Sequence, residues 1–414
     1  MRFHRLTMTF AVAAISIACA EAPEEASASA ETAIEEASVV TSPLVDVKTQ
    51  QFTDRPIPRF KADASWPKMP EDLILGHVPG VAVAADDTIW LIQRPNTLGF
   101  SDNGLDQDPP IAVCCRAAPH VMQFSQDGDY IKGWGGPDIA PAVDGVTQWP
   151  TVVHGIHIAP DGTVWIGGNG DGDHVVLNYT QEGEFIRAYG QRTETAGNYD
   201  QALLGNPADI AVDPTSGDVL IADGYINKRI IGFDAETNEF SRYWGAYGVS
   251  PDSKTREGQF DQSQASSNAD GGANPTSDSF GDIVHCIVTG PDERIYVCDR
   301  RNNRVQVFET SDEGETVFVE NIVLAPETGG TRTASDVAFS PDGEYLYIAD
   351  MMNGQVWILD AETYEELGAI GRNGRYPGEF IWLHSVDVDS EGNLYTSEVN
   401  TGRRVQKFVM TGVE

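Results

Sequence analysis

A pattern of two apolar strands joined by a polar turn recurs six times along the chain, and it constrains the fold more than any other feature. Each copy has an apolar strand, a turn containing Asp or Gly, and a return strand rich in aromatic and β-branched residues. The shorter intervals between copies are about 50 residues, which is close to the length of one four-stranded propeller blade. The copies read PGVAVAADDTIWLIQR (79–94), HGIHIAPDGTVWIGGN (154–169), ADIAVDPTSGDVLIADGY (208–225), HCIVTGPDERIYVCDR (285–300), SDVAFSPDGEYLYIADMM (335–352) and HSVDVDSEGNLYTSEV (384–399).

Third strands such as RIIGF and RVQVF follow the copies, and fourth strands such as FIRAYG follow several of these. The two longest intervals hold insertions at residues 95–115 and 250–280. The sequence therefore predicts an all-β protein, a six-bladed β-propeller that spans residues 51–414. The last copy ends after its third strand, so we expect PRFKADASWP (58–67) to supply the missing outer strand and close the ring.

The N-terminal segment has the features of an export signal. Basic residues precede an apolar run, residues 6–18, that is too short to span a membrane. Residues 16–19 resemble a bacterial lipobox that would lipidate Cys19, whereas Ala18-Cys19-Ala20 also fits ordinary signal peptidase. We therefore predict a signal peptide at 1–19 and an exported protein, either a periplasmic protein or an outer-membrane or cell-surface lipoprotein of a bacterium. Residues 20–50 are rich in Ala, Glu and Ser, which predicts a disordered acidic tether.

The charge of the chain limits its partners. The formal net charge is -36 and the sequence pI is about 4.3. A nucleic-acid-binding protein needs a basic face, so we expect no DNA or RNA partner. We expect a monomer that takes a small-molecule or peptide substrate and meets a membrane only through an N-terminal lipid anchor.

Histidines occupy one repeat position on alternate blades. The first strand of a blade lines the central channel, so equivalent positions form a ring around the axis. Three imidazoles on alternate blades would converge there and leave a fourth coordination position open, which is typical of a catalytic zinc site. A single histidine at this position would more simply cap a strand. Along the six copies the position holds Pro79, His154, Ala208, His285, Ser335 and His384.

Two arginines and a tyrosine are predicted on the same rim as the histidines. The first two strands of a blade are antiparallel, so the residue after strand two lies near the residue before strand one. This places Arg94, Arg300 and Tyr225 beside the histidines. Arginine binds carboxylates bidentately, and a tyrosine near a metal can act as a base. Taken singly, each could instead form a surface ion pair or a packed ring. Both insertions leave from this rim, as a lid or substrate wall would.

Four cysteines remain if Cys19 is lipidated. Cys286 and Cys298 fall on neighbouring predicted strands, which favours a disulfide between them. Adjacent cysteines bond each other only with strain, so we do not expect a bond between Cys114 and Cys115.

With these residues in hand, the blades resemble NHL repeats, and the chain resembles the lyase domain of peptidylglycine α-amidating monooxygenase. The resemblance is carried by VVHGIHIAPDG, DIVHCIVTGPDERIYVCDR and WLHSVDVDSEGNLYTSE around the three histidines. DGYINKR around Tyr225, WLIQRP at Arg94 and VCDRR at Arg300 complete it. It implies zinc on His154, His285 and His384, which would bind the hydroxyl oxygen of a peptidyl-α-hydroxyglycine. Tyr225 would take the proton, and Arg94 and Arg300 would hold the carboxylate. The products would be glyoxylate and a peptide amide.

The chain departs from this family at two positions. The family has an aspartate after its third histidine that ligates a structural calcium, and here that residue is Ser385. Calcium is thus in question, although carbonyls near Val81 and Ile156 could contribute. The family's disulfide partner next to the tyrosine is Ile226 here.

Two other functions stay open. Some six-bladed propellers are metal-dependent hydrolases or lactonases, but those hold their metal mainly with carboxylate and amide ligands. A non-catalytic NHL scaffold at the cell surface is the third alternative, and it would not require His, Arg and Tyr positions to coincide on one rim.

Overall fold

The computed structural model describes residues 44–251, 275–281, 283–326, 328 and 332–414. The predicted signal peptide, Cys19, the tether up to residue 43 and most of the second insertion lie outside the described residues. No helix within the described part of the chain is long and apolar enough to cross a membrane.

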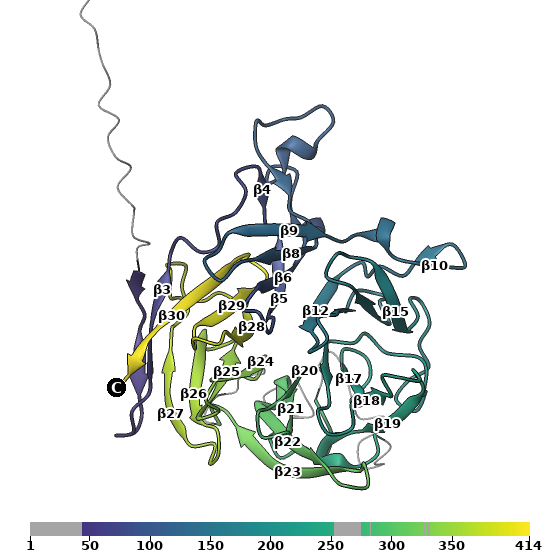
Figure 1. Ribbon diagram of the computed structural model, residues 1–414, viewed down its shortest axis with the longest axis vertical. Helices are drawn as coiled ribbons and strands as arrows, with labels where there is room; N and C mark the ends of the chain where they lie inside the picture. Colours follow the sequence, from purple (N-terminus) through teal and green to yellow (C-terminus); the bar gives the residue numbers. More distant parts are fainter. Residues whose placement is uncertain (1–43, 252–274, 282, 327, 329–331) are drawn as a thin grey trace, which may run out of the picture. The chain divides into compact units, whose positions relative to one another are not determined.

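Six antiparallel sheets form the blades of a β-propeller and follow one another around a ring, as Figure 1 shows. The predicted fold is confirmed. In blades 1 to 3, four strands run in chain order from the axis to the outside, with β7 (Arg116–Ala117), which follows the first insertion, interrupting blade 1. Blade 1 comprises β5 (His77–Val83), β6 (Ile89–Arg94), β8 (Val121–Phe124) and β9 (Tyr130–Trp134); blade 2 comprises β12 (Val153–Ile158), β13 (Val164–Gly168), β14 (Val175–Tyr179) and β15 (Phe185–Gly190); blade 3 comprises β16 (Asp209–Val212), β17 (Val219–Asp223), β18 (Arg229–Phe233) and β19 (Phe240–Trp244).

Blades 5 and 6 gain strands from the N-terminal side of the chain, and blade 4 does not. Blade 4 comprises β20 (Val284–Thr289), β21 (Ile295–Asp299), β22 (Arg304–Thr310) and β23 (Thr316–Val323); blade 5 comprises β24 (Asp336–Phe339), β25 (Tyr345–Asp350), β26 (Gln355–Asp360) and β27 (Glu366–Ile370), with β2 (Thr49–Gln51) at its edge; blade 6 comprises β28 (Leu383–Val388), β29 (Leu394–Glu398) and β30 (Val405–Val413), followed by β3 (Pro58–Asp63) and β1 (Leu44–Asp46).

The ring closes through β3, which pairs with β30 as the sequence predicted. The tether boundary at residue 50 is corrected, because β1 and β2 already belong to blades 6 and 5. Both are three-residue edge strands; β1 (LVD) mixes apolar and polar side chains, whereas β2 (TQQ) is polar. Their backbone groups extend existing sheets, so they need no apolar alternation of their own.

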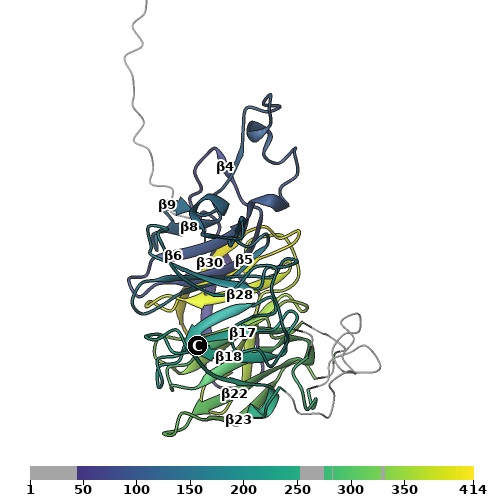
Figure 2. The same ribbon diagram turned by 90° about the vertical axis from the view of Figure 1, so that its right-hand side faces the viewer.

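The loops at one rim carry the remaining short elements. The first insertion leaves blade 1 after β6 and projects from the blades near β4 (Figure 1, Figure 2). An ion pair of 2.9 Å between Asp102 and Arg403 ties it to blade 6. The elements are β4 (Leu73–Ile74), β7 (Arg116–Ala117), β10 (Ala142–Val143), β11 (Val146–Thr147) and the 3-10 turns η1 (Pro95–Thr97), η2 (Gly104–Asp106), η3 (Pro137–Ile139), η4 (Ala246–Gly248) and η5 (Arg300–Asn302).

The core lies between neighbouring blades, where the middle strands of each blade are buried on both faces. Leu177, Ile221 and Ile348 are fully buried there. Each such side chain contributes about 1.5–3 kcal/mol to the free energy of unfolding. The blades are therefore rigid supports for the loops and inner strands that meet at the axis.

Candidate metal centre

The three histidines on alternate blades sit at irregularities in their strands. His154, His285 and His384 are each the second residue of an innermost strand, β12, β20 and β28. In all three strands the pairing register shifts at this point. The first strands of blades 3 and 5 pair without such a shift, whereas the first strand of blade 1 has one between His77 and Gly80, around Pro79. A β-bulge turns a side chain away from its regular direction, and one accompanies each of the three histidine positions.

A backbone carbonyl from the next blade fixes each imidazole. Nδ1 of His154 donates to the carbonyl of Ala208 at 2.8 Å. Nδ1 of His285 and of His384 donate to the carbonyls of Ser335 and Pro79, each at 2.6 Å. These three acceptors occupy, on the odd blades, the same repeat position that the histidines occupy on the even blades. The odd blades thus supply the support for the ligands that the even blades carry.

These hydrogen bonds decide the tautomer. A carbonyl only accepts, so Nδ1 of each ring carries the proton and Nε2 of each neutral ring has a free lone pair. Burial, first of all, lowers the pKa of all three histidines well below its usual value, and Arg94, Arg300 and the neighbouring imidazoles lower it further. The three rings are therefore neutral at pH 7.

The three free nitrogens converge. The ring centroids of His154, His285 and His384 lie 4.6–5.0 Å apart, and their ligand atoms all lie within 4.8 Å of one another. Nε2 of His285 and Nε2 of His384 are 3.2 Å apart. Neither carries a proton, so two lone pairs face each other, an arrangement that a cation between them would stabilise. Two nitrogens of a tetrahedral zinc site lie roughly 3.3 Å apart. The residues present therefore fit a divalent metal.

Tyr225 lies directly at this cluster. Its hydroxyl donates to Nε2 of His154 at 2.8 Å. The carboxylate of Asp223 fixes the loop that carries Tyr225. It accepts hydrogen bonds from Gly205 N, from the Asn227 amide and from Nε of Arg229. The ion pair of Asp223 and Arg229 is fully buried. Because breaking a buried pair costs about 3–5 kcal/mol, this loop is held firmly.

In blade 4, an aspartate at the equivalent position fixes the loop that begins with Arg300. Asp299 accepts hydrogen bonds from Gly281 N, the Asn302 amide and Arg304. Arg300 is 5% exposed and begins the turn η5 next to this aspartate. After burial, the charge of Arg300 is the largest cause that lowers the pKa of His285 and of His384.

Arg94 completes the rim at the end of β6. Its Nε donates to the carbonyl of Val153 at 2.7 Å, and one Nη donates to the Asn169 side chain at 3.3 Å. Burial lowers the pKa of Arg94 to about 10, and the charge of Asp173 opposes this shift. Arg94 thus stays cationic at pH 7.

On the other side of the histidines the axis holds a cavity of about 310 Å³, lined by residues of the six innermost strands. Arg94, Arg300 and Tyr225 do not line it. Three half-buried carboxyls line it, and their removal from bulk water raises the pKa of Asp209 to about 7 and of Asp387 to about 6, and raises the pKa of Asp336 well above its usual value. Sequence reasoning missed these carboxyls, although each lies in a first strand.

Ser385, where the resembling family has its calcium aspartate, also faces this channel. Its hydroxyl donates to the carbonyl of Val81 at 3.4 Å. Asp336 and Asp387 engage backbone amides of neighbouring blades, Val386 N and Val83 N. These contacts tie blades together, and the question of calcium that Ser385 raises in the sequence stays untested.

The cysteines form two disulfides. The predicted bond between Cys286 and Cys298 is confirmed, with the two Cα atoms 4.8 Å apart. The expectation that Cys114 and Cys115 do not bond each other is wrong, because the structure joins their sulfurs.

The structure thus brings all six predicted site residues to one place: three buried histidines, with a tyrosine on one of them and two arginines beside them. The partners that hold them were missed, namely the three backbone carbonyls and Asn169. The carbonyl positions were visible in the repeat alignment as Pro79, Ala208 and Ser335, but backbone acceptors leave no mark in side-chain identity. The fold and site define the class: a six-bladed β-propeller with a three-histidine cluster on its axis that could hold a metal.

Comparison with known proteins agrees with this class. A family described as "Lactonase, 7-bladed beta-propeller" matches residues 233–397, which is less than half of the chain. The blade count comes from the structure, which has six.

Three relatives are similar over longer stretches. Human "NHL repeat-containing protein 3" is 24% identical over 360 residues, 84% of this chain and 84% of that protein. The Caenorhabditis elegans "Probable peptidyl-alpha-hydroxyglycine alpha-amidating lyase pgal-1" is 24% identical over 347 residues, 80% of this chain and 81% of that protein. "Peptidylglycine alpha-amidating monooxygenase" of Rattus norvegicus is 24% identical over 262 residues, 62% of this chain but only 23% of that protein. This chain is therefore a distant relative of NHL-repeat propellers and of amidating lyases.

Proposed function

We propose that this protein is a zinc-dependent lyase that cleaves the C–N bond of a peptidyl-α-hydroxyglycine, or of a related α-hydroxy amide, to give an amide and glyoxylate. The observation that carries the proposal is the meeting of three unprotonated Nε2 atoms, the Tyr225 hydroxyl and two guanidiniums on one rim. The relatives described as amidating lyases support it.

The residues divide the chemistry between them. His154, His285 and His384 would hold the metal, which as a Lewis acid makes a substrate hydroxyl easier to deprotonate. Three imidazole ligands with an open fourth position suit zinc. Arg94 and Arg300 are cations that can bind the carboxylate of the substrate bidentately and fix its α-carbon near the histidines.

Tyr225 is the group placed to take a proton. Its oxygen lies at the cluster, within reach of a hydroxyl held there. As the hydroxyl proton passes to Tyr225, the O–H electron pair forms the aldehyde C=O of glyoxylate. The C–N bond breaks, and the nitrogen keeps the electron pair of that bond and takes the proton back from Tyr225 to become the amide. No water is consumed, so the reaction is an elimination.

A hydrolase or lactonase is the second candidate, favoured by the family match over residues 233–397. That region holds His285 and His384 but not His154, so the match does not account for the full cluster.

Metal analysis of the purified protein tests the proposal. We expect one zinc per chain, and loss of zinc in His154→Ala, His285→Ala and His384→Ala. His157→Ala is the matched control, because His157 lies on the same strand as His154 and outside the cluster; it should retain zinc. Protein that contains no metal and binds none on zinc titration would contradict the proposal.

Glyoxylate release then separates the two enzyme classes. A lyase should release glyoxylate from α-hydroxyhippurate, and Tyr225→Phe should slow this release about 10²- to 10⁴-fold. Opening of a lactone without any glyoxylate release would favour the hydrolase instead.

A further inference from the structure

The disulfide between Cys286 and Cys298 lies between two of the proposed site residues. Cys286 follows His285 directly on β20, and Cys298 precedes Asp299 and Arg300 at the end of β21. Blade 4 alone carries both a histidine of the cluster and an arginine of the rim. The sulfur–sulfur bond therefore joins β20, which carries His285, to β21, which leads directly into Arg300.

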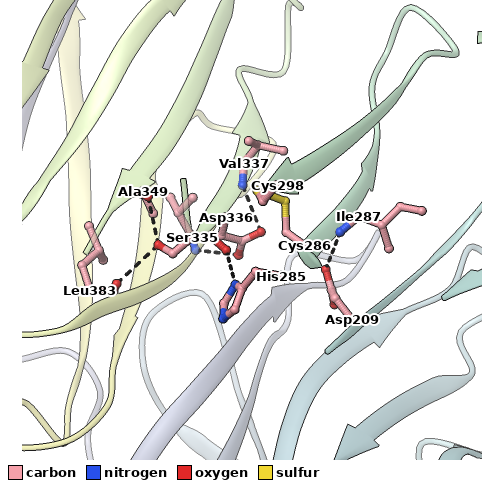
Figure 3. The surroundings of a disulfide bond; sticks show 11 residues. Asp209, His285, Cys286, Ile287, Cys298, Ser335, Asp336, Val337, Ala349 and Leu383 are labelled. Carbon is pink, nitrogen blue, oxygen red and sulfur yellow. Dashed lines mark hydrogen bonds between the residues drawn. A yellow bond between two sulfur atoms is a disulfide. The ribbon is translucent and has the colours of Figure 1, made fainter. Parts of the chain in front are cut away.

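The bond bridges the place where the two strands are least held by backbone pairing. The register of β20 and β21 shifts between Val284 and Ile287, and His285 and Cys286 lie inside this bulge. Figure 3 shows what else holds the bulge: Nδ1 of His285 on the Ser335 carbonyl, and Ile287 N on the carboxylate of Asp209 at 3.1 Å. Both contacts go to other blades, so within blade 4 the disulfide adds to the backbone pairs of Val284 with Asp299 and of Ile287 with Val297 that flank the bulge.

The other two histidine bulges carry small residues at the same pair of positions, Gly155 with Gly167 and Ser385 with Ser397. Each has its own support from the next blade. A Cβ on Gly155 would come within 2.5 Å of the Ala208 carbonyl, so that bulge is packed tightly against blade 3. Ser385 bonds to the backbone of Val81. Only blade 4 has a covalent brace.

Both sulfurs are in the core between blades 4 and 5. Cys286 is 1% exposed and Cys298 is fully buried, packed with Val305 and Tyr296. The bond is therefore shielded from bulk solvent in the folded protein, and Cys286 also lines the axial cavity.

We propose that the Cys286–Cys298 disulfide is a positioning element of the metal centre: it fixes His285 and Arg300 relative to each other, and its loss weakens metal binding and carboxylate binding. The part that concerns Arg300 rests on the proposed function, whereas the part that concerns His285 requires only that the cluster binds a metal. Groups that orient a metal ligand typically change metal affinity 10- to 100-fold.

The test replaces the brace by the pair that blade 6 already has. Cys286→Ser with Cys298→Ser should lower zinc affinity 10- to 100-fold in a chelator competition, and should raise KM for the α-hydroxyglycine substrate more than it lowers kcat. Cys114→Ser with Cys115→Ser is the matched control, since that disulfide lies in an exposed insertion, and it should leave zinc affinity unchanged. Leu367→Ala, a fully buried change in blade 5, controls for loss of stability alone.

The outcomes separate this proposal from the proposed function. Wild-type protein that binds no zinc would overturn both. Wild-type protein that binds zinc, with a double serine variant that binds it equally tightly or no more weakly than Leu367→Ala, would overturn only the positioning role. If the double serine variant does not fold, Ser385→Cys with Ser397→Cys decides: a new brace in blade 6 should slow zinc release to a chelator several-fold, and unchanged release would overturn the proposal.

Discussion

The hydroxyl of Tyr225 donates a 2.8 Å hydrogen bond to Nε2 of His154. That nitrogen is one of the three that would hold a metal, so the phenol occupies a lone pair that a metal would use. A bound metal would therefore displace this hydrogen bond, and the Tyr225 hydroxyl would need another hydrogen-bond partner near the cluster. A substrate hydroxyl at the open coordination position would be that partner.

Replacing Tyr225 by Phe should separate metal binding from chemistry. The phenyl ring leaves Nε2 of His154 free, so we expect zinc affinity equal to or slightly above that of the wild type. Loss of a general base typically lowers the rate about 10²- to 10⁴-fold, so kcat for glyoxylate release should fall by that factor. Chelator competition and a glyoxylate assay measure the two effects. A Phe variant that loses zinc would show that Tyr225 serves the fold of the site and not its chemistry.

Replacing Arg300 by Lys should weaken substrate binding. Lys keeps the charge but cannot form the bidentate contact with a carboxylate, and a hydrogen bond to a charged group contributes about 1.5–3 kcal/mol. We expect KM to rise roughly 10- to 100-fold with a smaller change in kcat. Arg301→Lys, at the next position of the same turn, is the control and should behave as the wild type. Equal KM values in both variants would remove Arg300 from the carboxylate site.

The channel carboxyl of Asp209 should make stability depend on pH. Burial raises the pKa of Asp209 to about 7 in the folded protein, above its ordinary value. The folded state therefore holds a proton that the unfolded chain has lost between roughly pH 4 and pH 7, and the free energy of unfolding falls as pH rises through this window. Asp387, with its pKa raised to about 6, acts in the same direction.

Asp209→Asn keeps an oxygen that can accept the hydrogen bond from Ile287 N. The variant removes the contribution of Asp209 to the pH dependence of stability. We expect the variant to be more stable than the wild type by about 2–4 kcal/mol at pH 8 and no more stable at pH 4. The three histidines have lowered pKa values and cost stability as pH falls below about 6.5, but they do so in both proteins and cancel in the difference. Thermal unfolding over this pH range measures it. An Asn variant that is less stable at pH 8 would mean that the carboxylate is ionised and bound, as a cation in the channel would require.

Replacing Cys19 by Ser distinguishes a lipidated N-terminus from one cleaved by ordinary signal peptidase. If Cys19 is lipidated, the wild type should fractionate with membranes and be released by detergent, whereas Cys19→Ser should be found in the soluble exported fraction. Cys114→Ser with Cys115→Ser should fractionate like the wild type. Identical fractionation of the wild type and Cys19→Ser would favour cleavage by ordinary signal peptidase.

Most of the fold could be predicted because propeller blades repeat. The number of strand–turn–strand copies predicts the number of blades. The last copy lacks an outer strand, which predicts that β3 pairs with β30. The cluster could be predicted for the same reason, since a repeat position becomes a ring position. Asp209 and Asp336 escaped notice because their role depends on burial, which a single strand does not reveal. The bond between Cys114 and Cys115 depends on local backbone geometry that sequence spacing does not fix.

The closing of the ring by β3 and β30 has a consequence for how the site comes into being. Blade 6 holds strands from both ends of the propeller, and it carries His384 between them. During synthesis, His154 and His285 leave the ribosome long before the partners of β3 exist. The third imidazole can join them only when the most distant segments of the chain have met, a slow step because it closes the longest loop. Metal capture would then report that the last blade has formed, and a chain cut short before β30 would present an incomplete site.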